Sequence, residues 1–233
     1  MRCTKNRQIK NKVITVFACV LGLAFALSGC SSSDSSTPVT TTTVTVSGAV
    51  TSENIPEEGV SVKGIYSATE STSPVTTSAT GTYTLTVDAN RAVSIQFSKS
   101  GLVTLNSGKE ALTANVTGAE VDIPTTAQAQ ALIDAAFGNI PLASVAWLAV
   151  SVEDANSDEV AGVTISSNAD AQVYTDCNGN DIGATATIAC PNDSRPMYLA
   201  YYNAPVEDSV SAVADTQIAP VRTGEVTFLD FEQ

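Results

Sequence analysis

The stretch Thr82-Tyr83-Thr84-Leu85-Thr86-Val87 decides the fold class. Apolar residues occupy every second position and alternate with threonine, which is polar and β-branched. This period of two predicts a half-buried antiparallel β-strand. The stretches Val44–Val50 and Val93–Phe97 have the same alternation, and glycines stand at the turn positions between the stretches. Several such strands in one segment are typical of a β-sandwich.

A second group of strands is expected after one short helix. Thr125-Thr126-Ala127-Gln128 fits a helix capping box, and the helix-forming run Ala127–Phe137 ends at Gly138. A strand is predicted at 147–152. Further strand candidates lie around Val163, Ile165, Val173, Ile188, Leu199, Tyr201, Val226 and Phe228. We therefore predict an all-β protein of two tandem sandwiches joined by one short helix.

The two groups of strands resemble a loose tandem repeat. Val46–Val50 followed by Gly59-Val60-Ser61-Val62 is matched by 150–154 followed by Gly162-Val163-Thr164-Ile165. The turn sequence 77–83 is matched by 175–179. Each repeat has about the size of a small sandwich.

The first repeat also resembles a known domain family. Val46-x-Gly48-x-Val50, Gly59-Val60-x-Val62 and the turn 79–87 are similar to the carboxypeptidase regulatory-like, or transthyretin-like, domain. The resemblance covers Val44 to about Gly101. It implies a transthyretin-like (Ig-like) sandwich of a kind that is usually a non-catalytic appendage, and the fold alone implies no activity.

The N-terminal segment is built like an export signal. Five basic residues precede the apolar run Val13–Leu27. As a helix this run spans about 22 Å, short of a hydrocarbon core of about 30 Å, which disfavours an uncleaved transmembrane anchor. The closing residues Leu27-Ser28-Gly29-Cys30 resemble the lipobox of bacterial lipoproteins. That resemblance implies cleavage before Cys30, lipidation of its thiol and, because Ser31 follows, transfer to the outer membrane of a Gram-negative bacterium.

These observations divide the chain into five segments. The expected order is a signal peptide at 1–29, a disordered Ser/Thr-rich tether at 30–43, a carboxypeptidase regulatory-like sandwich at 44–124, a helical linker at 125–141 and a second sandwich at 142–233.

Composition narrows the possible functions. After signal removal the chain keeps six basic and 24 acidic residues, a net formal charge of −18. Such a surface repels nucleic acid, so no nucleic-acid partner is expected. The chain has no histidine, which excludes Ser-His-Asp and Cys-His catalysis and any histidine-dependent metal centre. We therefore expect no cofactor and no enzymatic activity, with an unrecognised carboxylate pair as the remaining enzymatic alternative.

Two cysteines remain for a disulfide. Cys177 and Cys190 are an even pair in an exported chain, which favours a bridge between them. It would close a loop of about 14 residues and stabilise the fold by about 3 kcal/mol. A zinc site is disfavoured because two thiolates alone make a poor ligand set.

Two further groups are weak candidates for binding. Asp176, Asn178 and Asn180 have the spacing of a calcium loop, but Asp181 stands where an EF-hand needs glycine, and a simple turn is favoured. Trp147, Tyr198 and Tyr202 form either an exposed sugar-stacking platform or a buried face, of which burial is favoured.

The sequence thus predicts a non-catalytic, lipid-anchored envelope protein. It would act as a binding or scaffold module for another surface component, whether protein or glycan, and its contact with the membrane would be the N-terminal lipid. The alternative is a carbohydrate-binding lipoprotein that uses the aromatic residues of the second sandwich.

Overall fold

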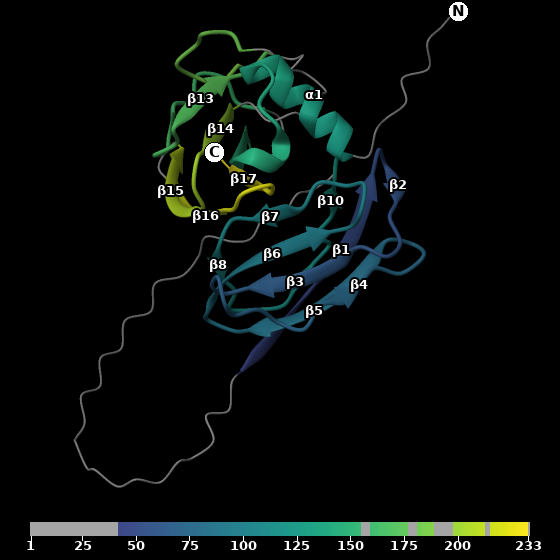
Figure 1. The fold of residues 1–233 in the computed structure, drawn as a ribbon. Helices are drawn as coiled ribbons and strands as arrows, with labels where there is room; N and C mark the ends of the chain where they lie inside the picture. Colours follow the sequence, from purple (N-terminus) through teal and green to yellow (C-terminus); the bar gives the residue numbers. More distant parts are fainter. Residues whose placement is uncertain (1–41, 155–158, 177–180, 189–197, 213–214, 233) are drawn as a thin grey trace, which may run out of the picture.

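The computed structural model describes residues 42–154, 159–176, 181–188, 198–212 and 215–232. This part of the chain is mostly β-strand and contains one α-helix, which confirms the predicted all-β class. Figure 1 shows two adjoining bodies, the first coloured blue to teal and the second green to yellow. None of the helices in these ranges is long and apolar enough to cross a membrane.

The first sandwich has two facing sheets. One is centred on β1 (Thr43–Ser52), which pairs antiparallel with β5 (Thr82–Asp88) and β2 (Ile55–Pro56), and parallel with β9 (Val116–Thr117) and β10 (Val121–Asp122). The facing sheet contains β3 (Ser61–Ile65), β4 (Val75–Thr76), β6 (Ala92–Ser98), β7 (Leu105–Ser107) and β8 (Glu110–Ala111).

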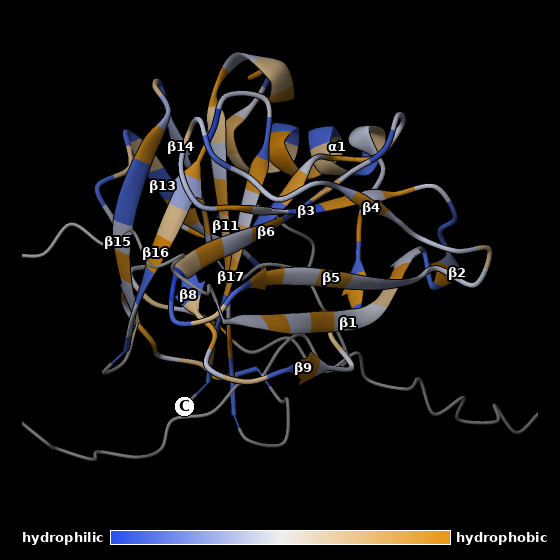
Figure 2. Ribbon diagram, turned by 90° about the horizontal axis from the view of Figure 1, so that it is seen from below, coloured by the Kyte–Doolittle hydropathy of each residue, from blue (hydrophilic) through white to orange (hydrophobic). Residues whose placement is uncertain are grey.

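The alternation of apolar residues places the first core. Every second residue of β5 is buried, beginning with Tyr83, while the threonines between them are exposed. Figure 2 shows the corresponding apolar bands along β1 and β5. The Tyr83 ring meets Phe97 of the facing sheet edge-on, with 5.6 Å between ring centroids. The two sheets therefore enclose one apolar core, as the period of two requires.

The second sandwich has its own core and two sheets. The strands of one sheet are β13 (Ala171–Tyr174), β14 (Tyr198–Tyr202), β11 (Ala146–Glu153) and β17 (Val226–Glu232). Those of the other are β12 (Ile165–Ser166), β15 (Val206–Ala212) and β16 (Asp215–Val221). The strand expected at Ile188 is wrong, since that residue lies outside any strand. Strands β15 and β16 were not predicted from the sequence.

A buried threonine recurs at the same place in both sandwiches. Thr77 Oγ1 accepts from Val60 N (2.9 Å) and donates to Glu57 O (2.6 Å). Thr187 Oγ1 accepts from Val163 N (3.0 Å) and donates to Val160 O (2.7 Å). The repeat is therefore real in structure, with Gly59 and Gly162 in matching places. The match proposed for its second part is wrong, because the counterpart of Thr77 is Thr187 and not Thr175.

One sheet runs through both sandwiches. Strand β17 pairs parallel with β7, with Val226 opposite Leu105 and Phe228 opposite Ser107. The result is a single strand order, β13-β14-β11-β17-β7-β6-β3-β4. The two apolar cores stay separate on either side of this junction. The segment boundaries at 124 and 141 remain predictions, and the shared sheet joins the parts that they separate.

The α-helix in the described part of the chain packs against both sandwiches, since Ala129 belongs to the first core and Ile133 to the cluster beside β11. Helix α1 (Thr126–Phe137) begins with the predicted capping box of Thr125 and Gln128 and ends at Gly138, whose φ of 76° suits glycine. A short 3-10 turn, η1 (Leu142–Ser144), leads into β11. Ile133 of α1 packs with Val145 and Trp147 in a third apolar cluster. The helix thus covers the face of the sheet that contains Trp147 of β11 and Tyr201 of β14, and Figure 1 shows α1 beside the second sandwich.

Candidate functional site

The three aromatic residues considered for sugar binding are buried. Trp147 is 1 % exposed, Tyr198 is 0 % exposed and Tyr202 is 3 % exposed. They also lie on opposite faces of the sheet, since Tyr198 and Tyr202 belong to the core of the second sandwich and Trp147 belongs to the cluster under α1. The exposed-platform interpretation is therefore wrong, and the favoured alternative of burial is confirmed.

Each buried aromatic side chain has a structural partner. The Trp147 ring packs against Phe137 and Tyr201, with ring centroids 5.7 Å and 5.6 Å away, and its indole N–H donates to Leu142 O at 3.1 Å. The Tyr202 hydroxyl donates to Asp208 Oδ2 at 2.6 Å. The Tyr198 hydroxyl donates to Gln172 Oε1 at 2.5 Å. These groups hold the core and the helix, and none is available to a ligand.

Several predicted sites lie outside the described residues. They are the lipidation site Cys30, the disulfide pair Cys177 and Cys190, and the calcium-loop candidates Asn178 and Asn180. Asp176 is described and stands just before this gap. Within the described ranges, no group of three or more acidic, cysteine or histidine side chains could hold a metal ion. The lipid, disulfide and calcium hypotheses stay predictions.

The polar groups that the structure brings together lie at the seam, which we define as the junction of β6, β7 and β8 with β16 and β17. Glu225 Oε2 accepts from Asn106 Nδ2 at 2.8 Å and from Gln96 Nε2 at 3.0 Å, and Gln96 also donates to Asn106 Oδ1 at 3.0 Å. Asn106 is 1 % exposed and Gln96 is 5 % exposed. One carboxylate of the second sandwich therefore satisfies two buried amides of the first.

Backbone bonds continue the seam in both directions. Val226 N donates to Thr104 O at 3.0 Å, and Lys109 N donates to Ile218 O at 2.7 Å. There is little free space here, because a Cβ on Gly108 would come within 2.8 Å of Leu229 Cδ2. The two sandwiches thus contact each other through main chain and packed side chains, without a hinge of solvated residues at this point.

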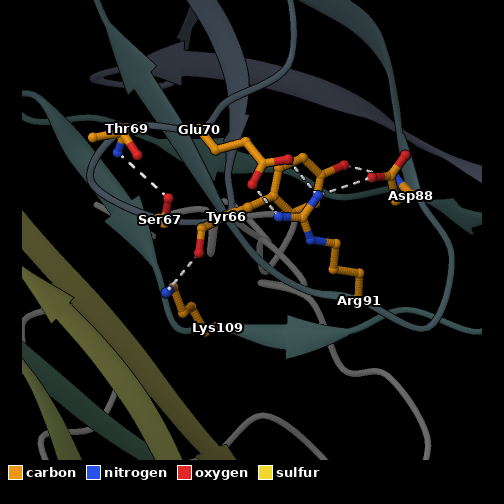
Figure 3. Close-up of polar contacts among 7 residues, drawn as sticks. All are labelled: Tyr66, Ser67, Thr69, Glu70, Asp88, Arg91 and Lys109. Atoms are coloured by element: carbon orange, nitrogen blue, oxygen red, sulfur yellow. Dashed lines mark hydrogen bonds and ion pairs between the residues drawn. The ribbon is translucent and has the colours of Figure 1, made fainter.

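Lys109 connects the seam to a charged cluster at one end of the first sandwich (Figure 3). Its ammonium forms an ion pair with Glu207 of β15 and donates to Tyr66 O at 2.9 Å. The guanidinium of Arg91 lies 4.1 Å from the centroid of the Tyr66 ring. Arg91 also forms a two-pronged ion pair with Glu70 and a longer one with Asp88 (3.3 Å). The cluster fixes the loop after β3 against the turn between β5 and β6.

The charged side chains of this cluster are paired with each other. The hydrogen bond from Arg91 lowers the pKa of Glu70 below its ordinary value. Arg91 and Glu70 are both substantially solvent-exposed. Exposed ion pairs of this kind contribute little to stability because solvent screens them. The cluster therefore holds a loop in place, and its cations and carboxylates are already engaged with each other.

Two carboxyl groups in the second sandwich, the buried Asp208 and the half-buried Asp230, have pKa values shifted in opposite directions. Burial opposes ionisation of Asp208, but hydrogen bonds from Tyr202 and from the Asn168 backbone and side chain lower its pKa overall. Asp230 lies on the seam-side sheet beside Ser151, and its Oδ1 has no hydrogen-bond partner among the described residues. Burial, with the nearby charges of Glu153 and Glu232, raises the pKa of Asp230 to about 7.

The seam could not have been located from residue types. Glu225 follows a glycine and precedes an ordinary strand, and nothing in its neighbours marks it as a bridge between repeats. Asp208 occupies a core position of β15 within a polar stretch that does not alternate clearly. Among the described residues, Glu225 at the seam is bound to two amides, and the cluster carboxylates Glu70, Asp88 and Glu207 are bound to cations. This arrangement can orient two sandwiches and offers no activated nucleophile.

The comparisons with known proteins give only distant structural similarities. No family model matches the chain, and no curated protein matches it significantly in sequence. Among solved structures, the Bacillus anthracis TIE protein is similar over 82 % of this chain and 34 % of its own, with 5 % identity and a TM-score of 0.28. A streptococcal ancillary pilin is similar over 82 % of this chain and 62 % of its own, with 10 % identity and a TM-score of 0.27.

A third similar structure is a DUF3823 family protein from Parabacteroides merdae. It shares 12 % identity over 77 % of this chain and 97 % of its own, with a TM-score of 0.25. Of the other two similar structures, the chain spans only about a third of the TIE protein and less than two thirds of the ancillary pilin. Likeness at this level supports no conclusion about the fold or the function of this chain.

Proposed function

We propose that this protein is a non-catalytic scaffold module of the bacterial envelope, anchored by lipid at Cys30. In this proposal the two sandwiches act as one body that holds another envelope component at a set distance and orientation. The observation that carries it is the shared sheet, in which β17 of the second repeat extends the sheet of the first through β7.

The seam supports a fixed orientation. A flexible connection between sandwiches would leave their adjoining edges solvated, because interfaces between mobile domains are small and polar. Here the edge strands pair, Glu225 satisfies two buried amides, and α1 covers the outer face of β11. The lipobox resemblance of Leu27-Ser28-Gly29-Cys30 supports the anchor, and the resemblance of 44–101 to a carboxypeptidase regulatory-like domain supports a non-catalytic role.

Photo-crosslinking in intact cells tests the proposal. A photoreactive amino acid is placed at exposed Thr80 in the first sandwich and at exposed Ala161 in the second. We expect adducts with an envelope component, and we expect Cys30→Ser to abolish them because the chain would no longer be held at the membrane. Adducts that persist unchanged in the Cys30→Ser variant, or no adduct from either position, would contradict an anchored scaffold.

A further inference from the structure

Strand β5 has one free edge in the first sandwich. Among the described residues it pairs only with β1, which leaves its other side at the margin of the sheet. Hydrogen bonds at both ends of this pairing show which residues of β5 bond to β1. Val50 N donates to Gly81 O (2.9 Å), and Ala89 N donates to Thr42 O (2.8 Å). In an antiparallel pair the bonded positions alternate. The N–H and C=O groups of Thr84 and Thr86 therefore point away from β1.

Both ends of this edge are closed by side chains. At one end Ser78 accepts from Thr82 N (3.2 Å) through Oγ and donates its own N–H to Thr82 O (2.9 Å). At the other end the Tyr66 hydroxyl accepts from Asp88 N at 2.7 Å. Between these caps, the outward backbone groups of Thr84 and Thr86 have no partner within the ranges that the structure describes. The free edge is therefore a short, unpaired length of strand that can pair with another strand.

The second sandwich shows how the corresponding edge is filled. Val50 O accepts from Glu57 N and Val152 O accepts from Val160 N (2.9 Å each), so Val152 corresponds to Val50, two residues away from the match predicted from the sequence. Tyr83 pairs with Gly48 of β1, and in the same place Tyr198 pairs with Val150 of β11. In that sandwich the edge is covered by β13, which runs antiparallel to β14 with Val173 opposite Leu199. Leu199 is the counterpart of Thr84. Within the ranges that the structure describes, no strand lies beside β5 in the position of β13, so the position that β13 fills in one repeat is open in the other.

The surroundings of the edge favour a cationic occupant. A shallow hollow of about 390 Å³ lies over the outer face of β5 and β1, with Gly118 and Glu120 on the far side of β1 from the free edge. It is lined by Ser47, Gly48, Ala49, Thr82, Tyr83, Thr84, Gly118 and Glu120. These are hydroxyl groups, backbone and one exposed carboxylate, with no cation among them. A second copy of this chain would bring the same net charge of −18 and be repelled.

We propose that the free edge of β5 binds an extended, lysine- or arginine-bearing peptide segment of a partner protein, antiparallel to β5 along Thr84–Thr86. Main-chain bonds would supply affinity, and a cationic side chain at an alternate position would lie over the hollow towards Glu120. The inference rests on the proposed scaffold role, for which it names the chemistry of the partner.

Peptide binding to the soluble mature chain, made as Cys30→Ser, tests this inference. The probes are synthetic hexapeptides of alternating lysine and valine, alternating serine and valine, and alternating glutamate and valine. We expect the lysine peptide to shift the amide resonances of Thr84 and Thr86 and slow their hydrogen exchange about tenfold or more, while amides of β15 are unaffected. The glutamate peptide should have no effect.

Matched variants separate the backbone from the charge. Thr84→Pro removes one edge N–H and should weaken binding about tenfold, the value of one hydrogen bond of ordinary strength. Glu120→Gln should weaken the lysine peptide and leave the serine peptide unchanged. Glu58→Gln should bind both peptides normally, because Glu58 is an exposed carboxylate that does not line the hollow. If Thr84→Pro does not fold, a lysine peptide with N-methylated edge amides makes the same test on the wild-type chain.

Three results would overturn the inference. They are binding without any change at Thr84 and Thr86, equal binding of the glutamate and lysine peptides, and self-association that Thr86→Pro abolishes, which would identify a second copy as the occupant. None of these results alters the seam. Failure here is therefore distinguishable from failure of the scaffold proposal, which depends on the orientation of the two sandwiches.

Discussion

Replacement of Glu225 by alanine should destabilise the protein more than any exposed substitution. The carboxylate accepts hydrogen bonds from Asn106 and Gln96, both of which are buried. Hydrogen bonds to a charged group contribute about 1.5–3 kcal/mol each, and an orphaned buried donor costs about 1–3 kcal/mol. Because Gln96 and Asn106 keep their bond to each other, we expect Glu225→Ala to lower the free energy of unfolding by about 2–4 kcal/mol.

Urea denaturation followed by circular dichroism measures this loss. Glu225→Gln keeps one carbonyl acceptor and should lose about 1 kcal/mol, the difference between a charged and a neutral hydrogen bond. Exposed Glu58→Ala is the matched control and should change the free energy of unfolding by less than about 0.5 kcal/mol. A loss for Glu225→Ala no larger than for Glu58→Ala would refute the argument that this carboxylate joins the sandwiches.

The other predictions concern the anchor, the disulfide and a buried acid. Cys30→Ser should move the protein from the membrane to the soluble fraction, and a variant that still resists carbonate extraction would indicate a transmembrane anchor. Alkylation of the unfolded, unreduced mature chain should label neither Cys177 nor Cys190, whereas labelling of both would rule out the bridge and its stabilisation of about 3 kcal/mol. Since the pKa of Asp230 is raised to about 7, the folded state holds this proton more tightly than the unfolded state, and stability should fall as pH rises from about 4 through 7. Asp230→Asn should remove that part of the pH dependence in denaturation curves, and an identical pH profile in wild type and variant would contradict it.

Local structure was readable where the alternation is clean. Strands β1, β5, β6 and β11 follow apolar residues at every second position, and α1 follows its capping box. Strand β15 was not predicted because its residues Glu207 and Asp208 break the apolar pattern. The buried Asp208 is satisfied by Tyr202 and Asn168, and the sequence does not show these contacts. The burial of Tyr198 and Tyr202 was correctly favoured because both faces of their strand are apolar.

Long-range pairing was beyond the sequence. The alternation of apolar residues shows which face of a strand is buried but not which strand lies beside it. The parallel pairing of β17 with β7 therefore has no local signature in the sequence. The same reason explains the misplaced second part of the repeat. Thr175 and Thr77 have similar neighbours in sequence, whereas the counterpart set by hydrogen bonds is Thr187. Glu225 gains its role from residues more than a hundred positions away.

The distance between the two sandwiches in solution tests the central claim most directly. Spin labels at Thr80→Cys and Ala161→Cys, with the predicted Cys177–Cys190 bridge left intact, report that distance by pulsed electron resonance. One narrow distribution is expected, and Val226→Pro, which removes the bond to Thr104 at the first residue of β17, should broaden it. A broad distribution in the wild-type chain, unchanged by Val226→Pro, would contradict a scaffold with fixed halves.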